Sequence, residues 1–115
     1  QNAMVEMGIS DKVTLFTASD FGRTAVENGD GTDHGWGAHH LVVGGAVNGQ
    51  KIYGEIPPYD RGDLAYTGDR GRLIPTTSVD QYAATLGGWF GLDQSELNDA
   101  LPNLNNFSEK NLGFI

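Results

Sequence analysis

Apolar residues gather in three short stretches in the first half of the chain. Residues 13–18 (VTLFTA) are rich in β-forming side chains and lack alternation, which is typical of a strand buried on both faces. Residues 41–45 (LVVGG) and 52–54 (IYG) predict two further strands, the second reached through the Asn48-Gly49 turn signal. The pattern therefore predicts an α/β fold with a small mixed sheet of three or four strands.

A helical pattern occupies the second half. Apolar residues recur at helical spacing on one side of residues 79–90, and we expect Tyr82, Leu86 and Phe90 to cover the strand at 13–18. Ser78 has capping-box spacing to the glutamine three residues later. The pattern therefore predicts a helix over residues 79–90. In the predicted fold, helices pack on the sheet.

Turn signals mark the boundaries of the remaining segments. Gly91 suits a helix C-cap, and Asp93 predicts the start of a second short helix that Pro102 helps to end. Residues 57–72 are rich in turn formers and charges and predict a long surface excursion. The apolar end of the chain, residues 112–115, is expected to dock on the fold.

Length and charge narrow the class of protein. The 115 residues allow one domain, which we place at residues 4–115 because residues 1–3 resemble a tag remnant in front of Met4. Seven basic and 15 acidic residues give a net charge of −8, which disfavours nucleic-acid binding. No apolar run approaches the roughly 18 residues that a membrane span needs. Cysteine is absent, so disulfides and thiolate metal sites are excluded.

Candidate chemistry is concentrated in residues 19–40. The segment holds all three histidines and several carboxylates, of which the candidate metal ligands are Asp20, His34, Asp33, His39 and His40. Carboxylate and imidazole together suit zinc, manganese or iron, and we expect a glycine-rich loop in this segment that can bring two such ligands together on an ion. Alternatively, Asp33 caps a turn beside a surface His34. Adjacent residues on an extended segment point to opposite faces, so at most one of His39 and His40 readily joins a common site.

Two other side chains of this segment are candidates for ligand binding. Arg23 can hold a phosphate or sulfate bidentately, or it can pair with Glu27 four residues later. Trp36, set among glycines, can serve as a ligand platform, or it can cover the edge of a core.

Several of these motifs together resemble a known family. Residues 19–24 (SDFGRT), the Asp33-His34 pair, the glycine-rich residues 42–54 and residues 75–91 resemble the C-terminal part of the bacterial domain of unknown function family 1501. The resemblance runs from about residue 13 to the end of the chain. Members of that family are usually several times longer, commonly carry a twin-arginine signal for export to the periplasm, and are grouped with the alkaline-phosphatase-like superfamily. That superfamily uses two-metal sites on a doubly wound α/β sheet to process phosphate and sulfate esters.

The resemblance also implies roles for particular residues. Residues 18–22 (ASDFG) resemble an Ala-Asp-His-Gly turn of that superfamily, and residues 31–34 (GTDH) resemble a segment whose histidine is a metal ligand. Asp20 and His34 are then the implied ligands of a zinc or manganese ion, and Arg23 the group that orients an anionic substrate. Phe21 stands where those enzymes have a ligating histidine, and phenylalanine cannot coordinate a metal.

The resemblance implies an incomplete site. In the superfamily the nucleophile and several carboxylate ligands lie upstream of the matching segment, and a two-metal site needs about six ligating groups. We therefore expect a fragment or remnant of a metal-dependent phosphate or sulfate ester hydrolase-like protein, without catalytic residues of its own and not competent alone. The alternative is a non-catalytic oligomeric or ligand-binding module. An uncovered strand at 13–18 also predicts a homo-oligomer, most simply a two-fold dimer that uses this strand or residues 42–45.

Overall fold

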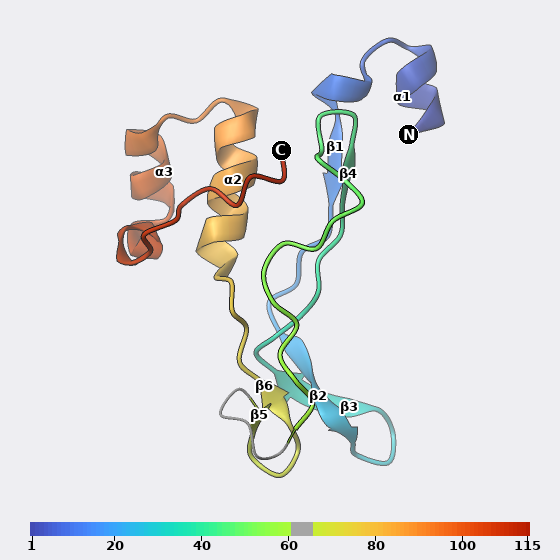
Figure 1. The fold of residues 1–115 in the computed structure, drawn as a ribbon, viewed down its shortest axis with the longest axis vertical. Helices are drawn as coiled ribbons and strands as arrows, with labels where there is room; N and C mark the ends of the chain where they lie inside the picture. The colour runs from blue at the N-terminus through green and yellow to red at the C-terminus, as the bar shows by residue number, and fades with distance from the viewer. Residues whose placement is uncertain (61–65) are drawn as a thin grey trace. The chain divides into compact units, whose positions relative to one another are not determined.

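The computed structural model of this chain describes residues 1–60 and 66–115 (Figure 1). In chain order its elements are α1 (Asn2–Glu6), η1 (Ser10–Lys12), β1 (Thr14–Phe16), β2 (Gly22–Glu27), β3 (Thr32–Gly35), β4 (Val42–Gly44), β5 (Tyr66–Thr67), β6 (Arg72–Leu73), α2 (Val79–Phe90), α3 (Gln94–Ala100) and η2 (Pro102–Asn106). None of the helices in these residues has the length and apolar character that crossing a membrane requires.

Contacts divide the chain into two compact units. The first comprises residues 1–15, 42–53 and 77–115, and the second comprises residues 16–41 and 54–76. The described strands form three two-stranded sheets, β1–β4, β2–β3 and β5–β6. The small mixed α/β fold is thus confirmed. Its strands are divided among three small sheets, where the sequence pattern placed them in one.

Both helices of the second half begin and end at the predicted residues. Ser78 caps α2 and accepts a hydrogen bond from the Asp80 N–H at 3.1 Å, while the Gln81 side chain accepts one from the Ser78 N–H at 3.0 Å. Gly91 ends α2 with a φ of 111° in the left-handed region, which glycine adopts without strain. Asp93 caps α3 in the same reciprocal way. These signals are local, so they depend little on the partner of each helix.

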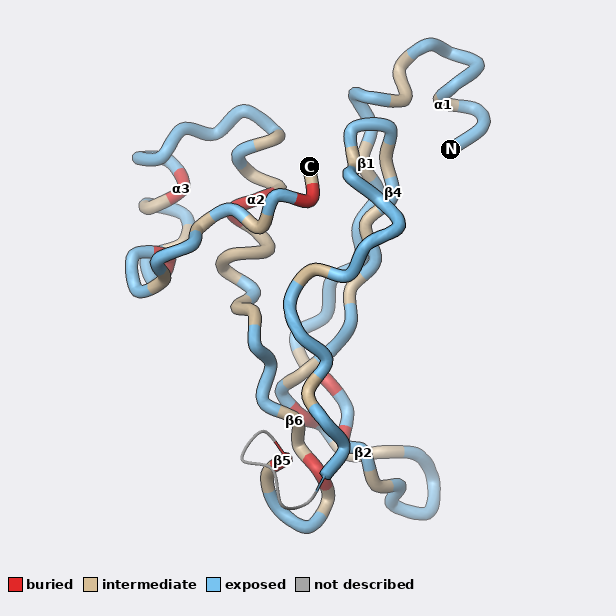
Figure 2. Tube along the Cα trace, in the orientation of Figure 1, coloured by how far each residue is buried: buried red, intermediate tan, exposed pale blue. Residues whose placement is uncertain are grey.

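The core of the first unit lies between α2, α3 and η2. Its buried members are Ala84, Leu97 and Leu104, with Leu101 packed against them (Figure 2). Leu104 is fully buried, with an exposed fraction of 0%. This cluster is the main apolar contribution to the stability of the unit.

The predicted docking of the apolar C-terminus is confirmed. Phe114 is only 4% exposed, and its ring centroid lies 5.6 Å from that of Tyr82 and 5.9 Å from that of Tyr53. The Asn48 N–H donates to the Phe114 carbonyl at 2.8 Å, which fixes the backbone at the same place. Burial also raises the pKa of the Tyr82 phenol above its ordinary value of 10.0.

The predicted buried face of α2 is wrong. Ala84 and Thr85 are its buried residues, whereas Phe90 is 82% exposed and Val79 is 66% exposed. The Thr85 hydroxyl donates to the Gln81 carbonyl and accepts from the Leu112 N–H, so its polar group is satisfied in the core. The helix turns this face inward because it packs on α3, η2 and the C-terminal segment.

Two strand predictions also need correction. The strand at 13–18 forms as the shorter β1, but it is not buried on both faces, since Leu15 is 66% exposed and Phe16 is 51% exposed. A two-stranded sheet with β4 leaves most of its surface uncovered. Residues 52–54 form no strand. The Tyr53 hydroxyl instead donates to the Asn48 carbonyl at 2.9 Å, which folds this segment back on the turn.

The second unit contains two antiparallel hairpins. Strands β2 and β3 pair within the segment expected to be a glycine-rich loop, and β5 and β6 pair inside the predicted excursion at 57–72. Part of that excursion, residues 61–65, lies outside the described residues. The outer edge of β2 is also bonded, because the Ala25 and Val26 N–H groups donate to the carbonyls of Gly71 and Arg70. The segment with the candidate chemistry is therefore an ordered strand pair.

Candidate functional site

A tight turn joins the two strands that carry the candidate residues. Residues 28–31 (NGDG) form it, with Gly29 at a φ of 95° and Gly31 at 151°. The Gly29 N–H donates to the Glu27 carboxylate at 2.7 Å, and the Asp30 N–H donates to the Asn28 side chain at 3.2 Å. Because these bonds fix the turn, they also fix which residues of β2 and β3 lie opposite each other.

Glycines allow the backbones of this unit to approach closely. Gly22 lies opposite Gly35, and a Cβ on Gly22 would lie 1.7 Å from the Gly37 carbonyl oxygen. A Cβ on Gly71 would lie 2.3 Å from the ring of Tyr66, which is 8% exposed. Three of these glycines, residues 22, 35 and 71, are buried. They therefore serve strand packing, where the sequence suggested a loop closing on an ion.

The hairpin has an inner and an outer face. Along β2, Gly22 and Thr24 are buried while Arg23 and Ala25 are exposed. Arg23 lies directly opposite His34, which is also exposed. Side chains alternate along a strand, so Asp33 belongs to the inner face and His34 to the outer face. The Asp-His pair of the sequence is thus divided between two surfaces.

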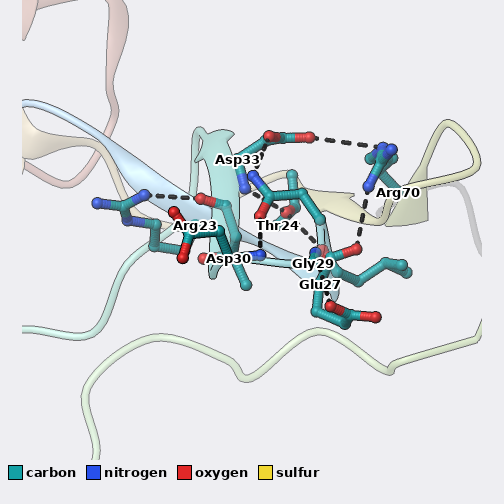
Figure 3. A network of polar contacts seen from close by, with 10 residues as sticks. Arg23, Thr24, Glu27, Gly29, Asp30, Asp33 and Arg70 are labelled. Atoms are coloured by element: carbon teal, nitrogen blue, oxygen red, sulfur yellow. Dashed lines mark hydrogen bonds and ion pairs between the residues drawn. The ribbon is translucent and has the colours of Figure 1, made fainter.

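On the inner face, Asp33 is held by three neighbours (Figure 3). Its carboxylate accepts a hydrogen bond from the Asn28 side chain at 2.7 Å and lies 3.5 Å from the Arg70 Nε. Its backbone N–H donates to the Thr24 hydroxyl at 3.1 Å. Arg70 also donates to the Glu27 carbonyl at 3.0 Å. Arg70 therefore joins the β5–β6 turn to β2 through the Glu27 carbonyl and to β3 through the Asp33 carboxylate.

On the outer face, Phe21 is a common platform for the side chains of Arg23 and His34. The His34 ring stacks on the Phe21 ring with centroids 3.9 Å apart and planes 18° apart. The Arg23 guanidinium carbon lies 4.9 Å from the centroid of the same ring. One Arg23 nitrogen donates to the Thr32 carbonyl at 2.7 Å. Arg23, His34 and Phe21 form what we call the outer-face cluster.

The other predicted site residues lie around this hairpin. Asp20 is exposed and immediately precedes Phe21 in the chain, and Trp36 is 63% exposed just after β3. His39 is exposed, while His40 is partly buried with its Nδ1 at 3.3 Å from the Thr17 hydroxyl. That hydroxyl also accepts a hydrogen bond from the Leu41 N–H at 2.9 Å.

No metal centre is assembled among the residues with described positions: they contain no group of three or more His, Asp or Glu side chains placed to hold one ion. Arg23 does not pair with Glu27, which was one of the two alternatives for it. It donates to a carbonyl, and Glu27 accepts from the turn at Gly29.

Sequence reasoning missed Arg70, Asn28 and the stacking role of Phe21. A signal was present for Asn28, because Asn28-Gly29 is a strong hairpin turn motif and a hairpin would have divided Asp33 from His34. The position of Arg70 depends on a contact between segments far apart in the chain, for which the sequence has no local signal.

These observations define the protein as a small α/β chain with an exposed aromatic and cationic hairpin face. Over residues 1–104 it matches the family described as "Protein of unknown function (DUF1501)". The chain belongs to this family, as its motifs predicted. Comparisons with curated proteins and with solved structures find no match.

Proposed function

We propose that this chain supplies part of the site of a metal-dependent phosphate or sulfate ester hydrolase-like protein of the alkaline-phosphatase-like type. In this proposal Asp20 and His34 hold a divalent cation, zinc or manganese, and Arg23 orients the anionic ester. The nucleophile and the remaining ligands come from outside the chain, which is a C-terminal fragment or remnant and is not competent alone. Family membership and the resemblance of residues 18–22 and 31–34 to ligand segments support this proposal.

The observation that carries the proposal is the register of β2 and β3. It sets Arg23 directly opposite His34 on the exposed face, and directly opposite residues have Cβ atoms about 5 Å apart. Asp20 is exposed and immediately precedes Phe21, whose ring stacks on His34. An imidazole and a guanidinium are therefore contributed from one face of one hairpin, and an exposed carboxylate lies in the segment that leads into it.

The donor set fits a partial metal site. A carboxylate oxygen and a neutral imidazole are ordinary ligands of zinc and manganese, and both Asp20 and His34 are exposed. When bound, such an ion would polarise the ester and stabilise the charge that develops on it. One Arg23 nitrogen donates to the Thr32 carbonyl, and the remaining N–H groups of the guanidinium can bind a tetrahedral oxyanion.

Metal titration of the three histidines tests the proposal. Zinc is added to isotope-labelled chain while the imidazole NMR signals are followed, and calorimetry gives the heat of binding. We expect the His34 signal to move first, and His34→Ala and Asp20→Asn to reduce affinity. His39→Ala and Asp30→Asn are matched controls that should retain it. Equal binding by His34→Ala and the unchanged chain, or no heat with either zinc or manganese, would contradict the proposal.

A second candidate function is a non-catalytic oligomeric module. The observation that favours it is the exposed apolar surface of β1 and β4, where Leu15 is 66% exposed and Val43 is 49% exposed. Each of these strands has a single strand partner in the described part of the chain, so each sheet edge can pair with a second copy. The occupant we favour is therefore another copy of this chain, in a two-fold dimer that buries more than about 1,000 Å².

Sedimentation at micromolar concentrations tests this second candidate. We expect a dimer that Leu15→Glu dissociates, because the charge would be buried at the interface. Ile52→Glu is the matched control, since Ile52 is 74% exposed and lies outside both strands. A monomer of 12.3 kDa for the unchanged chain would exclude the dimer.

A further inference from the structure

The turn at Asn48-Gly49 contains a glycine that its backbone does not require. Gly49 is not among the residues with a positive φ, and the left-handed position of this turn falls on Gln50, at a φ of 60°. A Cβ on Gly49 would have a single atom within 4 Å, the Val47 carbonyl oxygen at 3.9 Å. Alanine would therefore fit at this position, and neither conformation nor packing accounts for the glycine.

Asn48 has a fixed backbone and a free side chain. Its N–H donates to the Phe114 carbonyl at 2.8 Å, and its carbonyl accepts from the Tyr53 hydroxyl at 2.9 Å. The residue is exposed, and within the described part of the chain no hydrogen bond holds its side-chain amide. That amide can therefore turn toward the Gly49 nitrogen, which no Cβ shields.

We propose that Asn48 is a site of spontaneous deamidation, with water as the co-reactant. The Gly49 nitrogen bonds to the side-chain carbonyl carbon of Asn48 and gives up its proton, while the bond from that carbon to the amide nitrogen breaks and ammonia leaves. Water then opens the succinimide ring at either of its carbonyls. Opening at the side-chain carbonyl gives aspartate. Opening at the former main-chain carbonyl gives isoaspartate, whose backbone runs through the side chain and is longer by a methylene group.

The second Asn-Gly pair of the sequence, Asn28-Gly29, is an internal comparison. In both pairs the glycine N–H donates to an oxygen of the residue two positions earlier, so this bond does not distinguish them. The Asn28 amide, however, donates to the Asp33 carboxylate at 2.7 Å and accepts from the Asp30 N–H at 3.2 Å. Because it must first break these two hydrogen bonds, we expect Asn28 to react about 10- to 100-fold more slowly than Asn48.

The modification affects how Phe114 is docked. Asn48 contacts Phe114 through its N–H, and the Tyr53 ring contacts the Phe114 ring with centroids 5.9 Å apart. The Tyr53 hydroxyl closes the loop between these two contacts on the Asn48 carbonyl. In isoaspartate that carbonyl becomes a free carboxylate, and the chain between the two contacts is longer. Because Phe114 is only 4% exposed, its docking depends on both contacts, and isoaspartate should release residues 112–115.

Peptide mapping by mass spectrometry, after incubation at mildly alkaline pH, tests the site. The replacement of an amide by a carboxyl group is followed at both Asn-Gly pairs, and isoaspartate is separated from aspartate by chromatography. Gly49→Ala should slow the conversion of Asn48 to the rate of Asn28 or below, because the added methyl group hinders the attacking nitrogen. Gly88→Ala adds the same group at another open position and should change neither rate. Equal rates at Asn48 and Asn28, or equal conversion of Asn48 in Gly49→Ala and the unchanged chain, would overturn the site.

Hydrogen exchange tests the effect on Phe114. In the purified isoaspartate form, residues 112–115 should exchange about tenfold faster, as expected for the loss of a hydrogen bond that holds them. Asn48→Gln, incubated in the same way, is the control, because its longer side chain does not close the succinimide ring and its exchange should stay unchanged. Unaltered exchange in the isoaspartate form would overturn the link to Phe114. Neither measurement involves the proposed metal site, so its outcome is independent of the hydrolase-like function.

Discussion

Leu104→Ala tests which residues form the core of the first unit. Leu104 is 0% exposed and belongs to the cluster of Ala84 and Leu97. The substitution removes about three methylene equivalents, or roughly 2.4 kcal/mol at about 0.8 kcal/mol each, and leaves a cavity that adds to the loss. We expect the free energy of unfolding to fall by about 3 kcal/mol. That is a large share of the roughly 6–17 kcal/mol typical of a chain this long.

Phe90→Ala is the matched comparison, because the sequence pattern placed Phe90 in the core and the structure leaves it 82% exposed. Its substitution should cost less than about 0.5 kcal/mol, as surface changes do. Urea unfolding followed by circular dichroism measures both values. With a slope of about 2 kcal/mol per molar, Leu104→Ala should lower the midpoint by about 1.5 M. A larger loss for Phe90→Ala than for Leu104→Ala would refute the assigned core.

Three further predictions follow from the packing and the polar contacts. Gly22→Ala should lower the free energy of unfolding by about 3 kcal/mol or more in urea, since the added Cβ would lie 1.7 Å from a backbone carbonyl oxygen. Gly88→Ala is the comparison: the added Cβ would have nothing within 4 Å, so it should stabilise α2 by up to about 1 kcal/mol. Arg70→Gln and Asp33→Asn, combined in a double-mutant cycle, should give a coupling of about 0.2–1 kcal/mol, because both side chains are more than a third exposed to water; no coupling would contradict the bridge. Burial raises the pKa of Tyr82, so the folded state favours the neutral phenol. The free energy of unfolding should therefore fall as the pH rises above about 10, where the unfolded chain begins to lose this proton. Tyr82→Phe should reduce that fall in unfolding curves measured at alkaline pH.

Local signals predicted the helix boundaries of this chain well. The helix ends are set by hydrogen bonds of Ser78, Gly91 and Asp93 to residues no more than four positions away. The local sequence therefore contains nearly all the information that determines where these helices begin and end. The face that α2 buries is a different kind of property. It depends on α3, η2 and the docked Phe114, and an apolar stripe alone does not identify which of its sides meets them.

The sheets were predicted less well for a related reason. The apolar run at residues 13–18 indicates a strand, but burial on both faces requires covering elements, and β1 has only β4 as a strand partner among the described residues. The β2–β3 hairpin was missed because the buried positions of β2 are glycine and threonine. A strand whose buried side chains are so small has no hydrophobic alternation to detect, and only the Asn28-Gly29 turn marks it.

The Asp33-His34 pair illustrates how pairing decides between chemical alternatives that a sequence leaves open. Two neighbours in a loop can converge on one ion, whereas two neighbours in a strand point to opposite faces. Because they lie in β3, Asp33 contacts Asn28 and Arg70 on the inner face, and His34 stacks on Phe21 on the outer face. A ligand that uses His34 must therefore be completed from the outer-face cluster and its surroundings. Asp33 contributes by fixing the strand that presents His34, since the Arg70 bridge and the Thr24 hydrogen bond hold β3 against its neighbours.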